Sequence, residues 1–144
     1  MVNMSGIKIK DDAVNEFNQL KDKHAHKFIS LGFTDDLKEV EVKDIGPKDS
    51  TFEDLLKVLP KDHVRYIFYD CAYTKLSGEK RNKVIFVAWS SDDDAPLKEK
   101  VLITSTMGEI KAKCTGFAKG TAINDFDEMM EENFINIVSE NRAK

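Results

Sequence analysis

The sequence predicts a single domain of the α/β class (α+β type), with a five-stranded mixed β-sheet flanked by four main helices. The first observation is a pair of almost wholly apolar runs, Val64 to Cys71 and Val84 to Trp89. Strands that are apolar on both faces are normally covered on both faces, so these runs predict two central strands. The second observation is the helical spacing of apolar residues in four other stretches. The third is the length of 144 residues, which suits one core, so residues 1–144 are expected to form one domain.

The elements of the N-terminal third follow from local patterns. Residues 1–9 look extended and unanchored and are expected to form a flexible N-terminal segment. From Lys10 to His24 the apolar residues recur at helical spacing, which predicts a first amphipathic helix. Lys27 to Phe33 is a short apolar run, and Leu37 to Ile45 alternates between apolar and polar residues. They are predicted to form two paired strands joined by a turn at residues 34–36.

The middle of the chain contains a short helix and a hairpin. Gly46-Pro47 breaks the strand pattern, and Ser50 or Thr51 is expected to cap the helix that follows. Its buried stripe is predicted to be Phe52, Leu55, Leu56 and Leu59. The two central strands are expected to be joined by a long hairpin tip from Thr74 to Lys83, with its turn at Ser77-Gly78.

The stretch from Asp94 to Gly116 is expected to be one long, bent helix. Its first residue can act as a cap, Pro96 falls in the first turn, and its last residue suits a left-handed helix end. The hydroxyls and glycine at residues 104–108 are recognised causes of bending. A bend there would let two offset apolar stripes reach one core. These stripes are Leu97 with Val101, and Ile103 with Met107, Ile110 and Cys114.

The chain is expected to end with a strand and a helix. Phe117 to Ile123 predicts a last short strand, and Asp125 with Glu128 fits a capping box for a final helix. The apolar stripe of that helix is predicted to be Phe126, Met130, Phe134, Ile137 and Val138.

Composition argues against several classes of protein. The formal net charge is −4, and nucleic-acid-binding domains usually carry an overall basic surface. No apolar run approaches the roughly 20 residues of a transmembrane helix, and the N-terminus lacks the apolar core of a signal peptide. Cys71 and Cys114 are expected to be buried free thiols in a reducing cytosol, with a disulfide as the alternative.

The sequence shows no pattern typical of catalysis. It has no glycine-rich phosphate loop, nucleophile elbow or zinc-ligand spacing. His24 and His26 are two residues apart and would point to different faces of a helix, so they are not expected to bind a metal. Residues 92–94 are three aspartates without the glycine and distal glutamate of a calcium loop. We therefore expect no enzyme activity, cofactor or metal. The alternative hypothesis, in which the protein is an enzyme, is a small hydrolase.

Several segments together resemble one protein family over essentially the whole chain. In order, they are Ser5-Gly6-Ile7, Phe17 to Lys21, Lys27 to Ile29, Leu55 to Pro60, Arg65 to Asp70, Lys80 to Phe86, and Trp89-Ser90 followed by Ala95 to Lys100. This sequence of segments is similar to the actin-depolymerising factor/cofilin family, that is, to an ADF-homology domain. No single segment carries the resemblance; their order, spacing and joint presence do.

The resemblance implies an actin-binding protein that binds monomers and filaments, prefers ADP-actin, and promotes depolymerisation or severing. It also implies a cytoplasmic, cytoskeleton-associated monomer, with phosphoinositide headgroups as a second kind of ligand. By position, the residues on the monomer-binding face are Ser5, Gly6, Lys98, Lys100 and Lys111. The filament-binding residues are Arg81 and Lys83, and Ser5 is also the expected site of regulatory phosphorylation.

Some positions depart from the family pattern and leave alternatives open. Residues that replace a charge common in relatives are Met107, Gly108, Ala112, Asn136, Ile137 and Glu140. These departures concern filament binding and severing more than monomer binding. One alternative is a divergent member that acts mainly on monomeric actin, by sequestration or nucleotide exchange. Another is a glia-maturation-factor-like regulator of branched filaments, against which the N-terminal Ser5-Gly6 and the Arg81/Lys83 hairpin argue.

Overall fold

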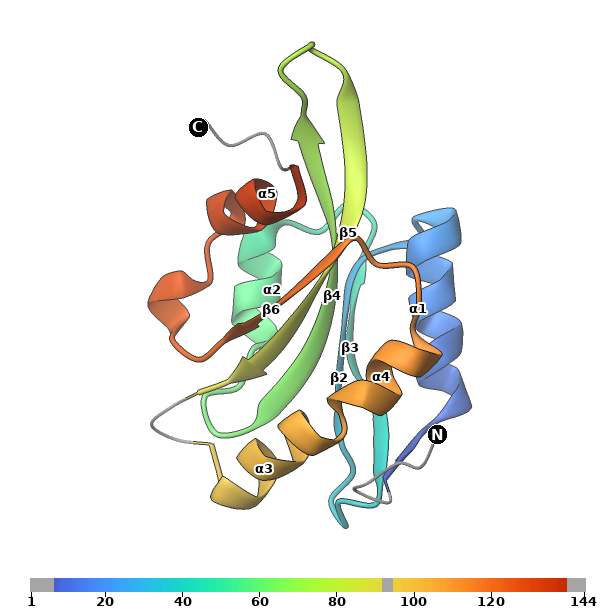
Figure 1. Cartoon of the computed structure of the whole chain (residues 1–144), viewed down its shortest axis with the longest axis vertical. Helices are drawn as coiled ribbons and strands as arrows, with labels where there is room; N and C mark the ends of the chain where they lie inside the picture. The colour runs from blue at the N-terminus through green and yellow to red at the C-terminus, as the bar shows by residue number, and fades with distance from the viewer. Residues whose placement is uncertain (1–6, 92–94, 140–144) are drawn as a thin grey trace.

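A mixed β-sheet runs through the middle of the molecule, with helices packed on both of its faces (Figure 1). The structure is a computed structural model, and it describes residues 7–91 and 95–139. Within these residues, the elements in chain order are β1 (Lys8–Ile9), α1 (Asp11–Lys23), β2 (His26–Phe33), β3 (Glu39–Pro47), α2 (Phe52–Val58), β4 (Val64–Thr74), β5 (Lys80–Ser90), α3 (Leu97–Ser105), α4 (Met107–Lys113), β6 (Lys119–Ile123), the 3₁₀-helix η1 (Phe126–Glu128) and α5 (Glu131–Ser139).

The strands lie in the order β1-β3-β2-β4-β5-β6. The four inner strands pair antiparallel, while the pairs β1–β3 and β5–β6 are parallel, so the mixed sheet is confirmed. Five strands were expected, and β1 is the additional one. Its side chain Ile9 is buried, as is Ile7 before it. The expected flexible segment at residues 1–9 is therefore wrong for residues 7–9, while residues 1–6 lie outside the described chain.

Each face of the sheet carries its own apolar core. On the face covered by α1, α3 and α4, the ring of Phe68 lies between Phe17 and Phe86, at centroid distances of 4.5 and 5.0 Å. On the face covered by α2 and α5, Phe52 and Phe134 pack on each other edge to face at 5.1 Å. The prediction that β4 and β5 are covered on both faces is confirmed, because residues of both strands contribute alternately to the two cores.

The expected long helix is two helices in the structure. It breaks at Thr106, a fully buried residue, close to where the hydroxyl-rich stretch predicted a bend. The stripe from Ile103 to Cys114 packs in the core as predicted. The other stripe does not, because Leu97 is 77% and Val101 58% exposed to solvent. Helix α3 begins after Pro96; the cap expected from Asp94 falls outside the described residues.

The final helix also begins later than predicted. Asp125 caps the short η1 helix by accepting a hydrogen bond from the Asp127 N–H, and α5 starts only at Glu131. The interruption changes which methionine is buried: Met129 is buried, whereas Met130, expected in the apolar stripe, is exposed. At the start of α2, where Ser50 or Thr51 was expected to cap the helix, Thr51 forms a capping box with Asp54.

Candidate functional site

Helix α3 presents apolar side chains to solvent on the surface that also carries lysines. Leu97 and Val101 are one helical turn apart and both point away from the core. Lys98 is exposed and Lys100 is half-exposed on the same short helix. Contiguous exposed apolar side chains rimmed by charge are typical of a surface that binds another protein.

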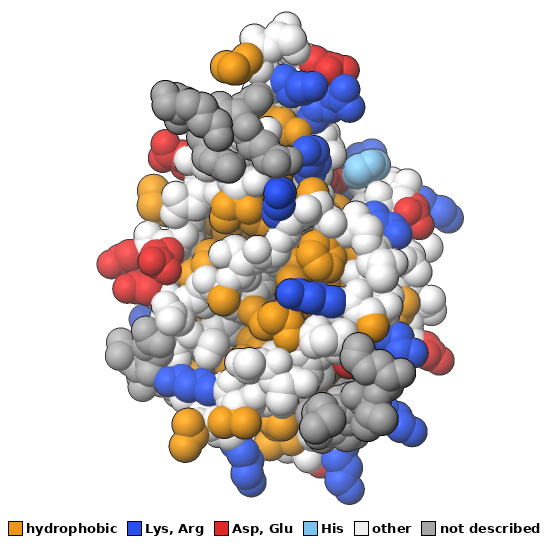
Figure 2. All heavy atoms as spheres, viewed as in Figure 1, with side chains coloured by type: hydrophobic (Ala, Val, Ile, Leu, Met, Phe, Trp, Pro, Cys, Tyr) orange, Lys and Arg blue, Asp and Glu red, His pale blue; other side chains and the backbone are white. Residues whose placement is uncertain are grey.

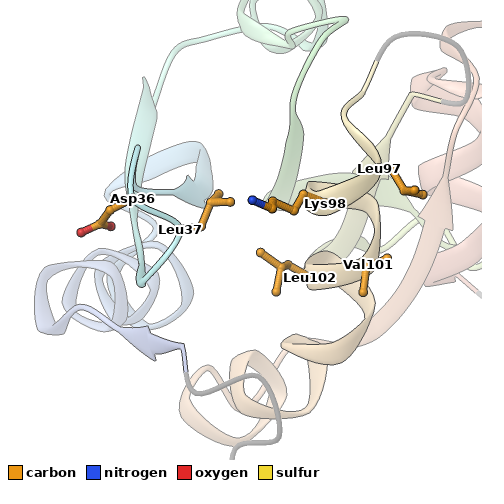
Figure 3. Close-up of a pocket in the computed structure, with 6 residues that line it drawn as sticks. All are labelled: Asp36, Leu37, Leu97, Lys98, Val101 and Leu102. Atoms are coloured by element: carbon orange, nitrogen blue, oxygen red, sulfur yellow. The ribbon is translucent and has the colours of Figure 1, made fainter.

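A groove of about 540 Å³ lies between α3 and the turn that joins β2 to β3 (Figure 3). The residues that line it are Asp36, Leu37, Leu97, Lys98, Val101 and Leu102. Figure 3 shows Leu37 projecting from the turn toward Lys98 and Leu102 on the helix, while the Asp36 carboxylate points away from them. The groove therefore has an apolar lining with a cation on one wall and an anion at the outer rim of the other.

The β2–β3 turn is held in place by its own hydrogen bonds. The Thr34 hydroxyl donates to Asp36 Oδ1 at 2.6 Å, and the Lys38 N–H donates to the same oxygen at 3.1 Å. These two bonds, the hydroxyl first, lower the pKa of Asp36, so the carboxylate stays charged and keeps the turn closed. Leu37 lies in the left-handed region at φ 59°, which is uncommon for a branched side chain. Its packing against the core favours that conformation and places it in the groove wall.

The break at Thr106 separates two helices that pack differently on the sheet. The buried hydroxyl of Tyr66 donates to the carbonyl oxygen of Ile103 at 2.6 Å, in the last turn of α3. Burial raises the pKa of Tyr66, so this hydroxyl remains a donor at any ordinary pH. Ser105 also donates back to the Leu102 carbonyl, the kind of contact that bends helices. After the break, α4 returns Ile110 to the core, while α3 buries Ile103 but leaves Leu97 and Val101 exposed.

The residues that the resemblance assigns to a monomer-binding face are only partly brought together. Lys98 lines the groove, and Lys100 lines a smaller hollow on the other side of α3, toward β6. Lys111 is exposed on α4 and does not line the groove. Ser5 and Gly6 lie outside the described residues. The chain enters the fold beside the groove, however, because the Lys8 N–H donates to the Lys38 carbonyl next to the turn.

The two residues assigned to filament binding lie on the hairpin of β4 and β5, which projects beyond the helices (Figure 1). Its turn is at the predicted place, with Gly78 at φ 91°. Arg81 is exposed and pairs with Glu79 at 2.9 Å. Lys83 is half-buried, and its ammonium donates to the Val138 carbonyl at the end of α5 at 3.3 Å. Arg81 is thus exposed and paired with a neighbouring side chain of the hairpin, whereas Lys83 also contributes to the fold.

Basic side chains occur at several places on the surface shown in Figure 2. Some lie near the projecting hairpin at the top, some at the lower end of the molecule, and others lie between them among apolar and uncharged surface. The hairpin and the end of the molecule where α3 lies therefore both carry basic side chains.

Sequence reasoning missed part of the groove. The sequence pattern predicts Asp36 in a turn and Leu37 in a strand, and no local signal could show that this turn lines a groove with a helix far along the chain. Leu97 and Val101 did carry a signal, because their stripe is offset from the buried one. The pattern predicts a bend that brings this stripe to the core; in the structure the stripe faces solvent instead.

The described part of the chain offers no arrangement suited to metal binding. It contains no group of three or more His, Cys, Asp or Glu side chains that could hold a metal ion. The histidines each face a carboxylate, His24 with Asp70, His26 with Glu16 and His63 with Glu99. Both cysteines are free and buried, as predicted, and burial raises the pKa of each thiol to about 12. None of the helices described is both long and apolar enough to cross a membrane.

Comparison with known proteins gives consistent matches over nearly the whole chain. The family described as cofilin/tropomyosin-type actin-binding protein matches residues 6–139. Actophorin of Acanthamoeba castellanii is 36% identical over 90% of this chain and 92% of its own. Actin-depolymerizing factor 3 of Arabidopsis thaliana is 34% identical over 87% of this chain and 89% of its own. The crystal structure of Streptomyces griseoflavus cofilin superposes with a TM-score of 0.85 at 28% identity, covering 95% and 100% of the two chains.

Proposed function

Because the chain belongs to the cofilin/tropomyosin-type actin-binding family, we propose that it binds actin monomers and filaments and promotes filament depolymerisation and severing. The family is one of binding proteins, so no catalytic step is involved. The observation that carries the proposal is the outward-facing α3, with Leu97 and Val101 exposed beside Lys98. A helix that leaves its apolar side uncovered is suited to fill a groove on a partner.

The chemistry of α3 suits an actin monomer with an acidic rim around an apolar groove. Leu97 and Val101 would enter the partner's groove, where their burial supplies affinity. Lys98 and Lys100 would meet carboxylates at its edge, which steers association and sets orientation. The walls of the protein's own groove, Leu37 and Leu102, would contact the partner from the side of the β2–β3 turn. Lys111, exposed on α4, would extend the same contact.

The filament contact is assigned to the projecting hairpin. Arg81 is exposed near its end and would meet a second actin subunit. One observation favours the alternative of a protein that acts mainly on monomers: Lys83, the second assigned cation, donates to the Val138 carbonyl inside the molecule. With one of two cations partly used in the fold, filament binding would rest mainly on Arg81, and monomer sequestration or nucleotide exchange would dominate.

A further proposal concerns regulation of actin binding through phosphorylation of Ser5. Phosphorylation of Ser5 would add about −1.5 to −2 charge to a segment that joins the fold beside the groove, and would repel an acidic partner. Ser5→Glu should then weaken monomer binding at low salt, while Ser5→Ala should not.

The lysines of α3 and α4 would also accept phosphoinositide headgroups, which vesicle competition against actin would test. We place the protein in the cytoplasm with the actin cytoskeleton, as a monomer.

The decisive experiment compares two basic regions in one set of assays. Replacing Lys98 and Lys100 together with alanine should weaken binding of monomeric ADP-actin by about 1–3 kcal/mol, the range for charge-assisted contacts. The melting temperature should stay unchanged because neither side chain is buried. Lys113→Ala, an exposed lysine of α4 outside the groove, is the matched control.

Arg81→Glu should reduce co-sedimentation with filaments and leave monomer affinity intact, since Arg81 lies on the hairpin, away from the groove. Lys83 is left in place so that its contact with α5 is preserved. Equal losses of monomer and filament binding would contradict the division into two faces. Unchanged monomer affinity in the double lysine variant would contradict the assignment of α3.

A further inference from the structure

Helix α3 lacks the anchors that usually hold a surface helix. The residue at its N-cap, Pro96, offers no side-chain hydrogen bond to the first turn. Leu97 and Val101 face solvent, and Ile103 in the last turn is the buried residue of the helix. Apolar burial therefore holds the C-terminal end of α3 but not its N-terminal half. That half carries the residues proposed to contact the partner.

One carboxylate ties this N-terminal half to the sheet. Glu99 is the third residue of α3, and its side chain is only 13% exposed. Its Oε2 lies 2.9 Å and its Oε1 3.2 Å from His63 Nδ1. The same Oε1 accepts a hydrogen bond from the Val64 N–H at 3.1 Å. His63 and Val64 stand at the start of β4, so the carboxylate joins the first turn of the helix to a central strand.

We propose that Glu99 is a positioning residue: its carboxylate, held by His63 and Val64, sets the orientation in which α3 presents Lys98, Lys100 and the exposed apolar pair. Glu99 does not line the groove itself. A largely buried charge with several donors is favourable only while those donors stay in place, so the tie also restrains the helix against rotation. The consequence for actin binding rests on the proposed function; the tie itself does not.

A carboxylate suits this place because it accepts from His63 in either charge state of the imidazole. Neutral His63 with its proton on Nδ1 donates to Glu99, and protonated His63 donates with added charge attraction. A glutamine at position 99 could still accept from the Val64 N–H. Its amide NH₂, however, could donate to His63 only when the ring is neutral and Nδ1 carries no hydrogen. In a protonated His63, Nδ1 is a donor as well, so two donors would face each other. Besides Glu99, the charged groups around His63 are Asp62, with its Oδ1 4.0 Å from Nε2, and Asp35, Lys43 and Arg65, which line the same hollow of about 140 Å³.

The first test needs no actin. Hydrogen exchange of backbone amides should be faster throughout α3 in Glu99→Ala than in the wild type, and unchanged in α1 and α5. Glu109→Ala is the matched control, because Glu109 lies on the adjoining α4 and its carboxylate has no hydrogen bond in the described structure. Exchange in α3 that is identical in the Glu99→Ala and wild-type proteins would overturn the proposed tie.

The second test follows monomeric actin binding from about pH 8 to about pH 5, the interval in which histidines change charge. Each affinity is expressed relative to wild type at the same pH. Glu99→Ala should bind about tenfold more weakly throughout. Glu99→Gln should bind nearly as wild type at the upper end and fall toward Glu99→Ala at the lower end. Removing the histidine in His63→Ala/Glu99→Gln should abolish this pH dependence.

The outcomes separate the two proposals. A Glu99→Gln variant that follows wild type at every pH, or a Glu99→Ala variant of normal affinity, would overturn the positioning role. A simple loss of stability would lower the melting temperature without the histidine-dependent pH profile. A wild-type protein that binds no actin at all would overturn the proposed function, and the exchange experiment would still decide whether Glu99 holds α3.

Discussion

Phe28 and Gly46 show how one residue can set the course of a strand. The sequence pattern predicts that the strand ends before Gly46-Pro47, yet β3 continues through Pro47. Gly46 stands opposite Phe28 of β2, next to an irregularity in the pairing of the two strands. A Cβ at position 46 would lie far inside van der Waals contact with the Phe28 ring. The glycine is therefore required for the room it leaves to the aromatic ring.

At this position we expect Gly46→Ala to destabilise the protein by about 1–3 kcal/mol, because Phe28 is buried and must shift to accommodate the methyl group. Gly108→Ala is the control: nothing lies within 4 Å of the added atom, and alanine in a helix is favoured by up to about 1 kcal/mol. Urea unfolding of both variants measures the difference. Similar midpoints for the two variants would contradict this account of Gly46.

At the level of elements, α3 and α4 show that one continuous helical pattern can divide into two structural roles. Helix α4 is held by the buried Ile110, with Cys114 just beyond it, whereas α3 is held mainly by Ile103 and by polar ties at its two ends. Those ties leave its apolar side free for a partner. Helix α3 must remain in place before a partner binds while it exposes Leu97 and Val101. Because these two apolar side chains face solvent, they cannot hold the helix on the core, and hydrogen bonds must do so.

The exposure of α3 gives a prediction for its apolar pair. Leu97→Ser together with Val101→Ser should leave the free energy of unfolding within about 1 kcal/mol of wild type, because both side chains are already exposed. Affinity for monomeric actin should nevertheless fall at least tenfold. Ile103→Ala changes a buried residue of the same helix and should, unlike the serine variant, lower the free energy of unfolding by about 2–5 kcal/mol. A large loss of stability in the serine variant would mean that the pair belongs to the core.

For the whole molecule, the two cores bury a thiol each, Cys114 on the α1 side and Cys71 on the α2 side. Burial raises the pKa of both from the ordinary 9.0 to about 12. Above about pH 9 the unfolded chain therefore releases protons that the folded protein retains. Stability must then fall as pH rises, since the folded state binds more protons. Below about pH 8 both states keep these protons, and the thiols add no pH dependence.

We expect the free energy of unfolding to decrease between about pH 9 and about pH 10 by up to about 1.4 kcal/mol per thiol. The double variant Cys71→Ala/Cys114→Ala should be less stable at neutral pH, because two buried side chains are truncated, but should lose most of this slope. Urea unfolding at fixed pH values measures both. An unchanged slope in the double variant would show that other groups cause the decline; Tyr66 and Tyr69, whose pKa values burial also raises, begin to contribute above about pH 10.

Much of the architecture was determined by the sequence alone. The central strands and the turn at Ser77-Gly78 were predicted correctly, and the cap predicted at Ser50 or Thr51 lies at Thr51. These features depend on composition over a few neighbouring residues: apolar runs, a glycine that accepts positive φ, and a hydroxyl placed before a helix. The family could likewise be recognised from segments read in order.

Only the tertiary structure decided which apolar stripe of the long helical stretch is left uncovered. Leu97 and Val101 have the spacing of a buried stripe, and helical periodicity is the same whether a stripe packs on the protein's own core or on a partner. The answer depends on distant residues: the Tyr66 hydroxyl on the Ile103 carbonyl, His63 and Val64 on Glu99, and Leu37 across the groove. These contacts join residues far apart in the chain, so no local pattern carries them, and they exist only once the sheet has brought both partners to the same end of the molecule.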